Sequence, residues 1–311
     1  MRLSRLVSLM LTAGCPTVGG QAVLEGVMMR NGDAYALALR RPDGEIVARR
    51  MPWFSLTRHP WLKKPFVRGF PVLIETLVNG IKALNRSAEH QAEGTEEELK
   101  GWHLVLTLLL SLAMAVGLFV VVPHLLSLLM QWLELGGGVE GLTFHLWDGL
   151  FKCLIFMGYI WAISFVPDIR RVFQYHGAEH KTIFCYEAGL PLTVENCRIQ
   201  PRHHPRCGTS FLFVVVVVSI LVSSLVFSFV NWRNMWVRMA LHLLLLIPIV
   251  GVTYEFNRYV GGHDNPVTNA LAKPGLWLQN FTTNEPDDSM LEVAIRAMEL
   301  VIPEQKGKDE W

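Results

Sequence analysis

The chain has 311 residues, of which 51% are hydrophobic and 18% charged, and its mean hydropathy is +0.31. This composition argues against a pair of ordinary soluble domains and favours long apolar segments. The net charge of +1 excludes a bulk electrostatic attraction to nucleic acid, so we expect no nucleic-acid partner.

The N-terminal region, residues 1–101, is predicted to lie in the cytoplasm and to contain a β-hairpin and a helix. Its first residues, Met1–Cys15, combine arginines with a short apolar run, and we interpret them as an uncleaved amphipathic segment. Strand formers alternate over Ala34–Met51 around a tight turn at Pro42–Glu45, a pattern that predicts a hairpin. Pro65–Arg86 is predicted to be helical.

A glycine-rich apolar run precedes this hairpin. Gly19–Arg30 holds three glycines together with a glutamine, a glutamate and an arginine. Glycine at this density marks close backbone approach or positive φ, which is common near a ligand; the alternative is the turn-rich start of a sheet. We therefore take Gln21, Glu25 and Arg30 as candidate cofactor-binding residues. Gln21 and Glu25 beside a metal would indicate a pocket, whereas on an exposed rim they would indicate a partner surface.

Four apolar runs predict membrane-spanning helices, at about 102–124, 149–167, 211–231 and 236–254. A helix needs about 20 apolar residues to cross the hydrocarbon core, and the first and third runs meet that length. The second meets it only if Lys152 extends its ammonium toward the membrane surface, and whether the second and fourth runs cross fully stays open. A transporter or channel is disfavoured, because under these bounds no charged residue lies deep within a run.

Basic residues set the predicted orientation. Residues 1–101 carry 14 of the 28 lysines and arginines, the loop 131–148 carries none, and the segment 168–210 carries six. Positive charge favours the cytoplasmic side, so we expect a multi-pass protein of the cell (inner) membrane with both termini cytoplasmic. The predicted fold class is a polytopic α-helical membrane protein with about four transmembrane helices, residues 102–254, and a small α+β cytoplasmic domain. The N-terminal region, the central loop 168–210 and the tail 255–311 build that domain.

The tail is predicted to contain one helix. Gly261–Asn280 is rich in glycine, proline and asparagine and is interpreted as a loop region. An amphipathic helix follows Glu285–Asp288, and we expect its apolar stripe to pack on the cytoplasmic domain. That stripe consists of Met290, Leu291, Ala294, Ala297 and Val301.

Potential metal ligands gather between the second and third spans. His176 and His180 are four residues apart, so on a helix both imidazoles leave one face. With Glu179 they give the order His-x-x-Glu-His, typical of inverted zinc hydrolases, in which two histidines bind zinc and the glutamate handles a proton. His204 and Cys207 follow as a second cluster. Because cytoplasmic thiols stay reduced, metal binding is a better interpretation of Cys207 than a disulfide.

The number of ligands decides what such a site does. The predicted ligands are His176, His180, His204 and Cys207. All four together would form a closed tetrahedral set, typical of structural zinc, with His203 as the alternative to His204. If only three bind, or if Glu187 or Glu195 takes a place, a position stays open for water.

An open site would be catalytic. Glu179 would then act as the general base, and Lys181 or Arg206 could steady a developing oxyanion. A cysteine ligand favours zinc over magnesium or calcium, while another transition metal such as iron stays an alternative.

The motifs are similar to those of one family. At Gly19–Arg30, Tyr175–Glu187, His204–Phe211 and Thr282–Asp288 the chain resembles the YqhQ-type family of bacterial integral membrane proteins. The resemblance covers nearly the whole chain, from about Gly19 to Pro303. This family is a domain of unknown function described as a predicted metal-dependent enzyme, so the resemblance implies a membrane protein with a metal site but implies no substrate.

Two functions are consistent with these features. The first is a zinc-dependent, membrane-embedded hydrolase that acts at the cytoplasmic face on a membrane-protein segment or a lipid-linked substrate. The alternative is a non-enzymatic scaffold or assistance factor in membrane-protein biogenesis or quality control, with a structural metal site. The expected partners are the lipid bilayer and a membrane-protein substrate or client; the oligomeric state is left open.

Overall fold

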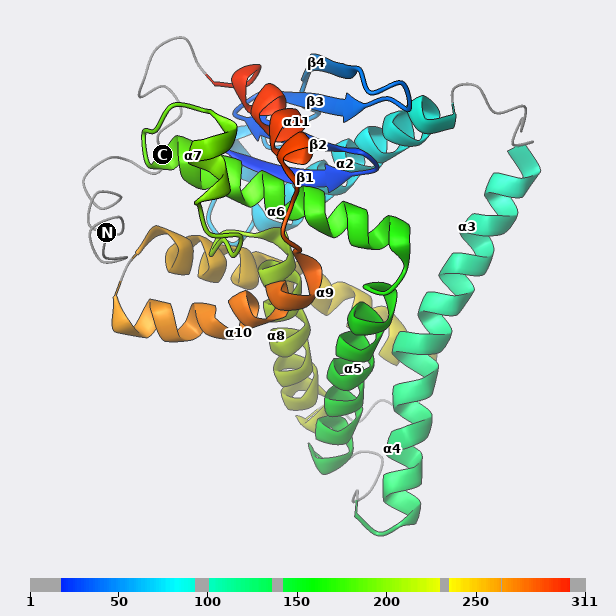
Figure 1. Cartoon of the computed structure of the whole chain (residues 1–311). Helices are drawn as coiled ribbons and strands as arrows, with labels where there is room; N and C mark the ends of the chain where they lie inside the picture. Colours follow the sequence, from blue (N-terminus) through cyan, green and yellow to red (C-terminus); the bar gives the residue numbers. More distant parts are fainter. Residues whose placement is uncertain (1–17, 93–100, 136–141, 230–234, 264, 303–311) are drawn as a thin grey trace.

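The computed structural model describes residues 18–92, 101–135, 142–229, 235–263 and 265–302, and the predicted start segment Met1–Cys15 lies outside them. A small sheet domain lies above a group of long apolar helices (Figure 1). Besides the strands, the sheet domain contains helices from distant parts of the chain, chiefly α2 (Gly69–Ala92), α6 (Pro167–Glu187) and α11 (Asp288–Glu299).

Four antiparallel strands form one sheet in the order β1-β2-β3-β4. The strands are β1 (Gly19–Val23), β2 (Gly26–Asn31), β3 (Ala34–Arg40) and β4 (Ile46–Pro52). The predicted hairpin is confirmed by β3 and β4, since Arg40 pairs with Ile46 across the turn. The glycine-rich run forms a second hairpin from β1 and β2, and its turn holds Glu25 at a φ of 50°.

Alternation along the strands gives the sheet two apolar faces. Val27 and Met29 point into a core that α6 and α11 complete, whereas Met28 and Leu37 point into a core that α2 covers. The predicted stripe of the C-terminal helix is confirmed, because all five of its residues are buried in the first core. A valine, leucine or methionine side chain stabilises the fold by about 1.5–3 kcal/mol when it is fully buried. The domain is therefore a sheet between two helical layers.

The helix predicted over Pro65–Arg86 is α2, and it begins later than expected. A short 3-10 turn, η1 (Pro60–Lys63), precedes it. Between the two, Phe66 has a φ of 64°, a left-handed conformation that a helix does not accommodate. The helix therefore starts at Gly69 and continues to Ala92.

Within the described residues, four helical segments are long and apolar enough to cross a membrane: Leu109–Trp132, Leu142–Ile163, Gly208–Val226 and Leu243–Gly262. The first lies in a continuous stretch of α3 (Gly101–Val116), the π-helix η2 (Gly117–Val121) and α4 (Val122–Trp132). The others are α5 (Leu142–Ile163), α8 (Gly208–Phe229) and α9 (Met235–Gly262). Leu110 and Leu244 are 68% and 64% exposed, as lipid-facing side chains are. These helices fit a membrane protein.

The second of these helices starts earlier than predicted. It begins at Leu142 rather than near residue 149, because residues 142–147 contain no proline, glycine or acidic or basic residue other than a histidine and continue the helix. Lys152 lies ten residues after Leu142, about 15 Å along the axis at a rise of ~1.5 Å per residue. Asp148 and Lys152 thus lie within this candidate span, and Glu255 lies within the candidate span of α9. The expectation that no charged residue lies deep within a run is therefore wrong for α5 and α9.

The prediction of a loop at Gly261–Asn280 is also wrong. Most of this segment is a helix, α10 (Pro266–Thr282), which lies across the upper end of α8 in Figure 1. Asn265 and Thr268 form a capping box at its start, and Pro266 occupies the first turn, where its missing N–H costs nothing. The turn-forming residues therefore mark a helix start. The segment 168–210 is likewise mostly helical, in α6 and in the short α7 (Val194–Arg198).

Candidate metal centre

Helix α6 presents the two predicted histidines on one face. The helix begins with Pro167 after the extended Val166, and Asp168 in its first turn suits the positive end of the helix dipole. One turn separates His176 from His180, and their ring centroids lie 4.4 Å apart. The two imidazoles therefore leave one face of α6, as their four-residue spacing predicts.

Cys207 completes a group of three. It lies directly before Gly208, the first residue of α8, and its Sγ is 3.2 Å from Nε2 of His176. One ligand atom from each of His176, His180 and Cys207 lies within 4.8 Å of the other two. His180 and Cys207 are buried and His176 is half-buried. Because α6 carries the histidines and α8 starts directly after the cysteine, the group lies at the junction between the sheet domain and the apolar helices.

Backbone carbonyls fix both imidazoles. Nδ1 of His176 lies 2.8 Å from the carbonyl oxygen of Thr282, and Nδ1 of His180 lies 2.5 Å from that of Arg202. Because a carbonyl oxygen only accepts, each Nδ1 carries a hydrogen, and in a neutral imidazole Nε2 then keeps its lone pair. This is the arrangement of metal-binding histidines, whose second nitrogen donates to a carbonyl or carboxylate.

The electrostatics of the group suit a cation. Burial, together with the neighbouring His176, lowers the pKa of His180 to about 4 against the opposing effect of Cys207. Burial alone would raise the pKa of the Cys207 thiol, but His180 and the Thr209 hydroxyl outweigh it and bring that pKa below its ordinary value. A neutral imidazole and a thiol that ionises readily are the states in which histidine and cysteine bind a metal.

Glu179 lies beside this group. Its side chain is buried, and its Oε2 has no hydrogen-bond partner among the described residues. Burial raises the pKa of Glu179 to about 8; Cys207 raises it too, while His176 opposes both. Gly20 on β1 makes room for this carboxyl, because a Cβ there would lie 2.8 Å from Glu179 Cδ. A glycine of the Gly19–Arg30 run thus contributes to the site.

His204 lies next to the three-residue group without belonging to it. Its ring centroid is 5.6 Å from that of His180, and its Nε2 is 3.5 Å from Glu187 Oε2. Gln279 holds the His204 backbone from both sides, with hydrogen bonds of 2.8 Å to its N–H and to its carbonyl. Nε2 of His204 and of His203 each lack a hydrogen-bond partner within the described part of the chain. A fourth histidine ligand stays a prediction.

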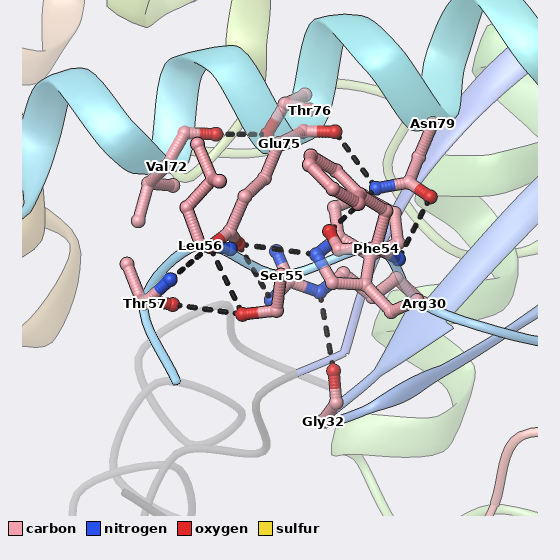
Figure 2. Close-up of polar contacts among 11 residues, drawn as sticks. Arg30, Gly32, Phe54, Ser55, Leu56, Thr57, Val72, Glu75, Thr76 and Asn79 are labelled. Atoms are coloured by element: carbon pink, nitrogen blue, oxygen red, sulfur yellow. Dashed lines mark hydrogen bonds and ion pairs between the residues drawn. The ribbon is translucent and has the colours of Figure 1, made fainter. Parts of the chain in front are cut away.

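The three predicted cofactor-binding residues have other partners. Gln21 points away from Glu179, and its carboxamide lies against Gly80 of α2. Glu25 forms a two-pronged ion pair with Arg171, at 2.5 and 2.6 Å. Arg30 lies over the ring of Trp53 and 3.9 Å from Glu75 in the network of Figure 2. None of these contacts includes a member of the histidine–cysteine group.

The residues proposed to steady an oxyanion, or to join the ligands, are also engaged. Lys181 is buried and donates to the Arg198 carbonyl at 2.8 Å, with Glu285 2.5 Å from its Nζ. Arg206 is paired with Glu187, and Glu195 is exposed on α7. Thr209, Thr282 and Gly20 support the centre and were missed, because only tertiary structure brings them to α6.

Comparison with known proteins places the chain in a family. A family model described as a protein of unknown function, DUF1385, matches residues 64–304. The chain is 37% identical over 299 residues to the uncharacterized protein YqhQ of Bacillus subtilis (strain 168), and the match covers 91% of each protein. No solved structure matches the chain. The chain therefore belongs to the DUF1385 family, whose function is not known, and the resemblance to YqhQ-type proteins is confirmed.

Proposed function

We propose that the protein is a zinc-dependent hydrolase that acts at the cytoplasmic surface of the cell (inner) membrane. His176, His180 and Cys207 would hold the ion, and Glu179 would be the general base. One observation carries the proposal: three ligand atoms within 4.8 Å of one another adjoin a buried carboxyl, one oxygen of which has no hydrogen-bond partner among the described residues. Two imidazoles with one thiolate form a donor set that suits zinc.

The ligand count supports an open site. With three protein ligands, a bound zinc would keep one position for water and would lower the pKa of that water to about 7. Glu179, with a pKa of about 8 in the absence of the ion, exchanges its proton near neutral pH, where a general base works best. Its burial keeps bulk water from competing for that proton.

The two basic side chains that the sequence suggests for stabilising an oxyanion during hydrolysis already have other partners. Lys181 and Arg206 are engaged by Glu285 and Glu187. The amino end of α8 begins directly after Cys207, and the first N–H groups of any helix have no partner within it. These N–H groups replace the two basic side chains as our candidate for oxyanion stabilisation.

The place of the centre supports a membrane-associated substrate. The apolar segment of α8 starts at Gly208, one residue after Cys207, so the ligands adjoin the predicted membrane boundary. A membrane-protein segment or a lipid-linked molecule would reach this level from the bilayer. The excess of basic residues in 1–101 and 168–210 supports a cytoplasmic location for the centre and both termini.

The alternative is a scaffold or assistance factor with a structural metal. An ion would tie α6 to the amino end of α8, and His204 lies close enough to His180 for a fourth ligand to be considered. A structural ion in that position would stabilise the junction between the sheet domain and the apolar helices, and Glu179 would then have no chemical role.

Glu179→Gln separates the two functions, because it preserves shape and removes the base. The variant replaces the native protein in cells, and membrane proteins and lipids are compared with those of wild-type and deletion strains. The hydrolase predicts that cells with the folded variant accumulate the same uncleaved species as the deletion strain. A variant strain indistinguishable from wild type would rule the hydrolase out and favour the scaffold.

A further inference from the structure

A second polar site lies within the apolar helices, apart from the metal centre. A cavity of about 460 Å³ opens between α5, α8 and the π-helix η2. Its volume falls in the range of ligand pockets, roughly 300–1,000 Å³. Phe119 of η2 and Tyr159 of α5 form part of its wall, with ring centroids 5.8 Å apart. A π-helical turn inside a long helix is often found at a functional site.

An ion pair lies in this cavity. Lys152 Nζ is 2.5 Å from Asp148 Oδ2 on the next turn of α5, and both residues line the space. The side chains of Lys152 and Asp148 are 31% and 17% exposed, so a ligand in the cavity can reach them. Ionisable side chains within a membrane span are costly and mark functional sites more often than they stabilise a fold.

Polar and apolar residues occupy opposite ends of the cavity. Gly149 of α5 lies against Ile220 of α8, since a Cβ there would come within 2.2 Å of the isoleucine side chain. This contact sets Asp148 and Lys152 beside the carboxyl half of α8, which contributes Ser219 and Ser223. His145 and Ser224 line the same end.

The apolar end is formed by later residues of α5 and earlier ones of α8, namely Phe156, Ile160, Leu212 and Val215. A site with a polar end and an apolar end matches an amphiphile that lies along the helices. The polar end is the one farther from the sheet domain, because α5 starts and α8 ends there (Figure 1).

We propose that this cavity binds one phospholipid whose head carries both a phosphate and a primary ammonium. Lys152 would donate to the phosphate, and Asp148 would accept from the ammonium, while an acyl chain lies between Phe156 and Val215. Charge complementarity selects the head: an anionic lipid without an amine draws Lys152 away from Asp148 and supplies no cation in its place, and a quaternary amine has no N–H to donate. The proposal is independent of the metal centre.

Native mass spectrometry of the full-length protein in detergent tests the selectivity. The probe is an equimolar mixture of phosphatidylethanolamine, phosphatidylglycerol and phosphatidylcholine. We expect one phosphatidylethanolamine per chain to be retained preferentially, and the double variant Asp148→Asn/Lys152→Met to lose that preference about tenfold. Leu150→Met, on the same helix but outside the cavity lining, should retain it. Equal retention of all three lipids, or equal preference in the double variant, would overturn the proposal.

A second measurement uses only the wild-type protein and therefore tests the proposal even if the double variant does not fold. A phosphatidylethanolamine with a photoreactive group on its acyl chain is cross-linked to the protein in nanodiscs, and the labelled peptides are sequenced. Labels should concentrate near Phe156 and Val215, and excess unlabelled phosphatidylethanolamine should compete for them. Labels spread evenly over the exposed leucines of α3, without competition, would contradict the site.

Discussion

Two glutamates are buried in the sheet domain, on helices that cover opposite faces of the sheet, and their surroundings differ. Glu75 of α2 is fully buried and accepts hydrogen bonds from Trp53 Nε1, Ser55 Oγ and the Leu56 and Thr57 N–H groups, as Figure 2 shows in part. Glu179 of α6 is 4% exposed, and its Oε2 has no hydrogen-bond partner among the described residues.

The contrast appears in the pKa values. Burial alone would raise the pKa of Glu75, but its hydrogen bonds from Thr57, Trp53 and Ser55 outweigh burial and lower it. The pKa of Glu179 is raised to about 8, because burial meets no comparable set of donors. A carboxyl surrounded by donors holds a structure together, whereas one left without them is available for a ligand or a proton.

The largest expected effect is on Glu75. Glu75→Ala removes the acceptor of several buried donors and the partner of Arg30, and it should lower the free energy of unfolding by about 3–5 kcal/mol. Denaturant unfolding in mild detergent, followed by tryptophan fluorescence, measures it. Glu292→Ala, which removes a half-exposed ion pair with Arg40, is the matched control and should cost less than about 1 kcal/mol. Equal losses for Glu75→Ala and Glu292→Ala would contradict a stabilising role for the hydrogen bonds of Glu75.

Glu179 should instead change how stability depends on pH. In the metal-free protein, native Glu179 holds its proton up to about pH 8, while the unfolded chain releases it near pH 4.5. The native state therefore binds more protons between these values, so its stability falls as pH rises through this window, by a few kcal/mol at most. Glu179→Gln should abolish that part of the slope. Parallel stability curves for wild type and variant from pH 5 to 9 would contradict the assignment.

Gly20 provides a smaller test of the same site. Gly20→Ala would place a Cβ 2.8 Å from both Glu179 Cδ and the Met28 carbonyl oxygen, so it should cost about 1–3 kcal/mol and displace the carboxyl. The adjacent Gly19 has nothing within 4 Å of its Cβ position, and Gly19→Ala should change stability by less than about 0.5 kcal/mol. Thermal unfolding of the two variants measures the difference, and equal stability of the two would contradict the packing of Glu179 on β1.

The smallest effect concerns the thiol. Thr209 Oγ1 lies 3.1 Å from Cys207 Sγ, and Thr209→Val removes that contact while keeping the side chain's size. The thiol should become harder to ionise, and zinc affinity should fall by about tenfold, the lower end for a residue that orients a ligand. Competition with a chromophoric chelator reads the affinity. Thr76→Val, on an exposed turn of α2, is the control and should leave it unchanged.

Patterns with a short period were sufficient to predict much of the molecule. The alternation over Ala34–Met51, the stripe of α11 and the four-residue spacing of His176 and His180 each depend on local geometry. The structure therefore agrees with them. Where a signal had two local meanings the prediction was wrong, as at Gly261–Asn280, since proline and asparagine cap helices as well as form loops.

Contacts between distant segments could not be predicted. The register of β1 points Gly20 toward Glu179 and Gln21 toward α2, so neighbouring residues of one motif serve opposite faces. A shift of one residue would exchange them, and the turn at Glu25 that sets the register has no decisive sequence signature. The depth of Lys152 likewise depended on where α5 begins, and residues 142–147 extend it by nearly two turns.

The central claim is that His176, His180 and Cys207 hold a metal ion beside Glu179, and elemental mass spectrometry of the detergent-purified protein tests it most directly. We predict one zinc per chain in the wild type, its loss in His180→Ala and its retention in Glu179→Gln. Cys197→Ala, which alters a buried cysteine outside the group, is the control and should keep the metal. No stoichiometric metal in gently purified wild-type protein, or full zinc content in His180→Ala, would contradict the account.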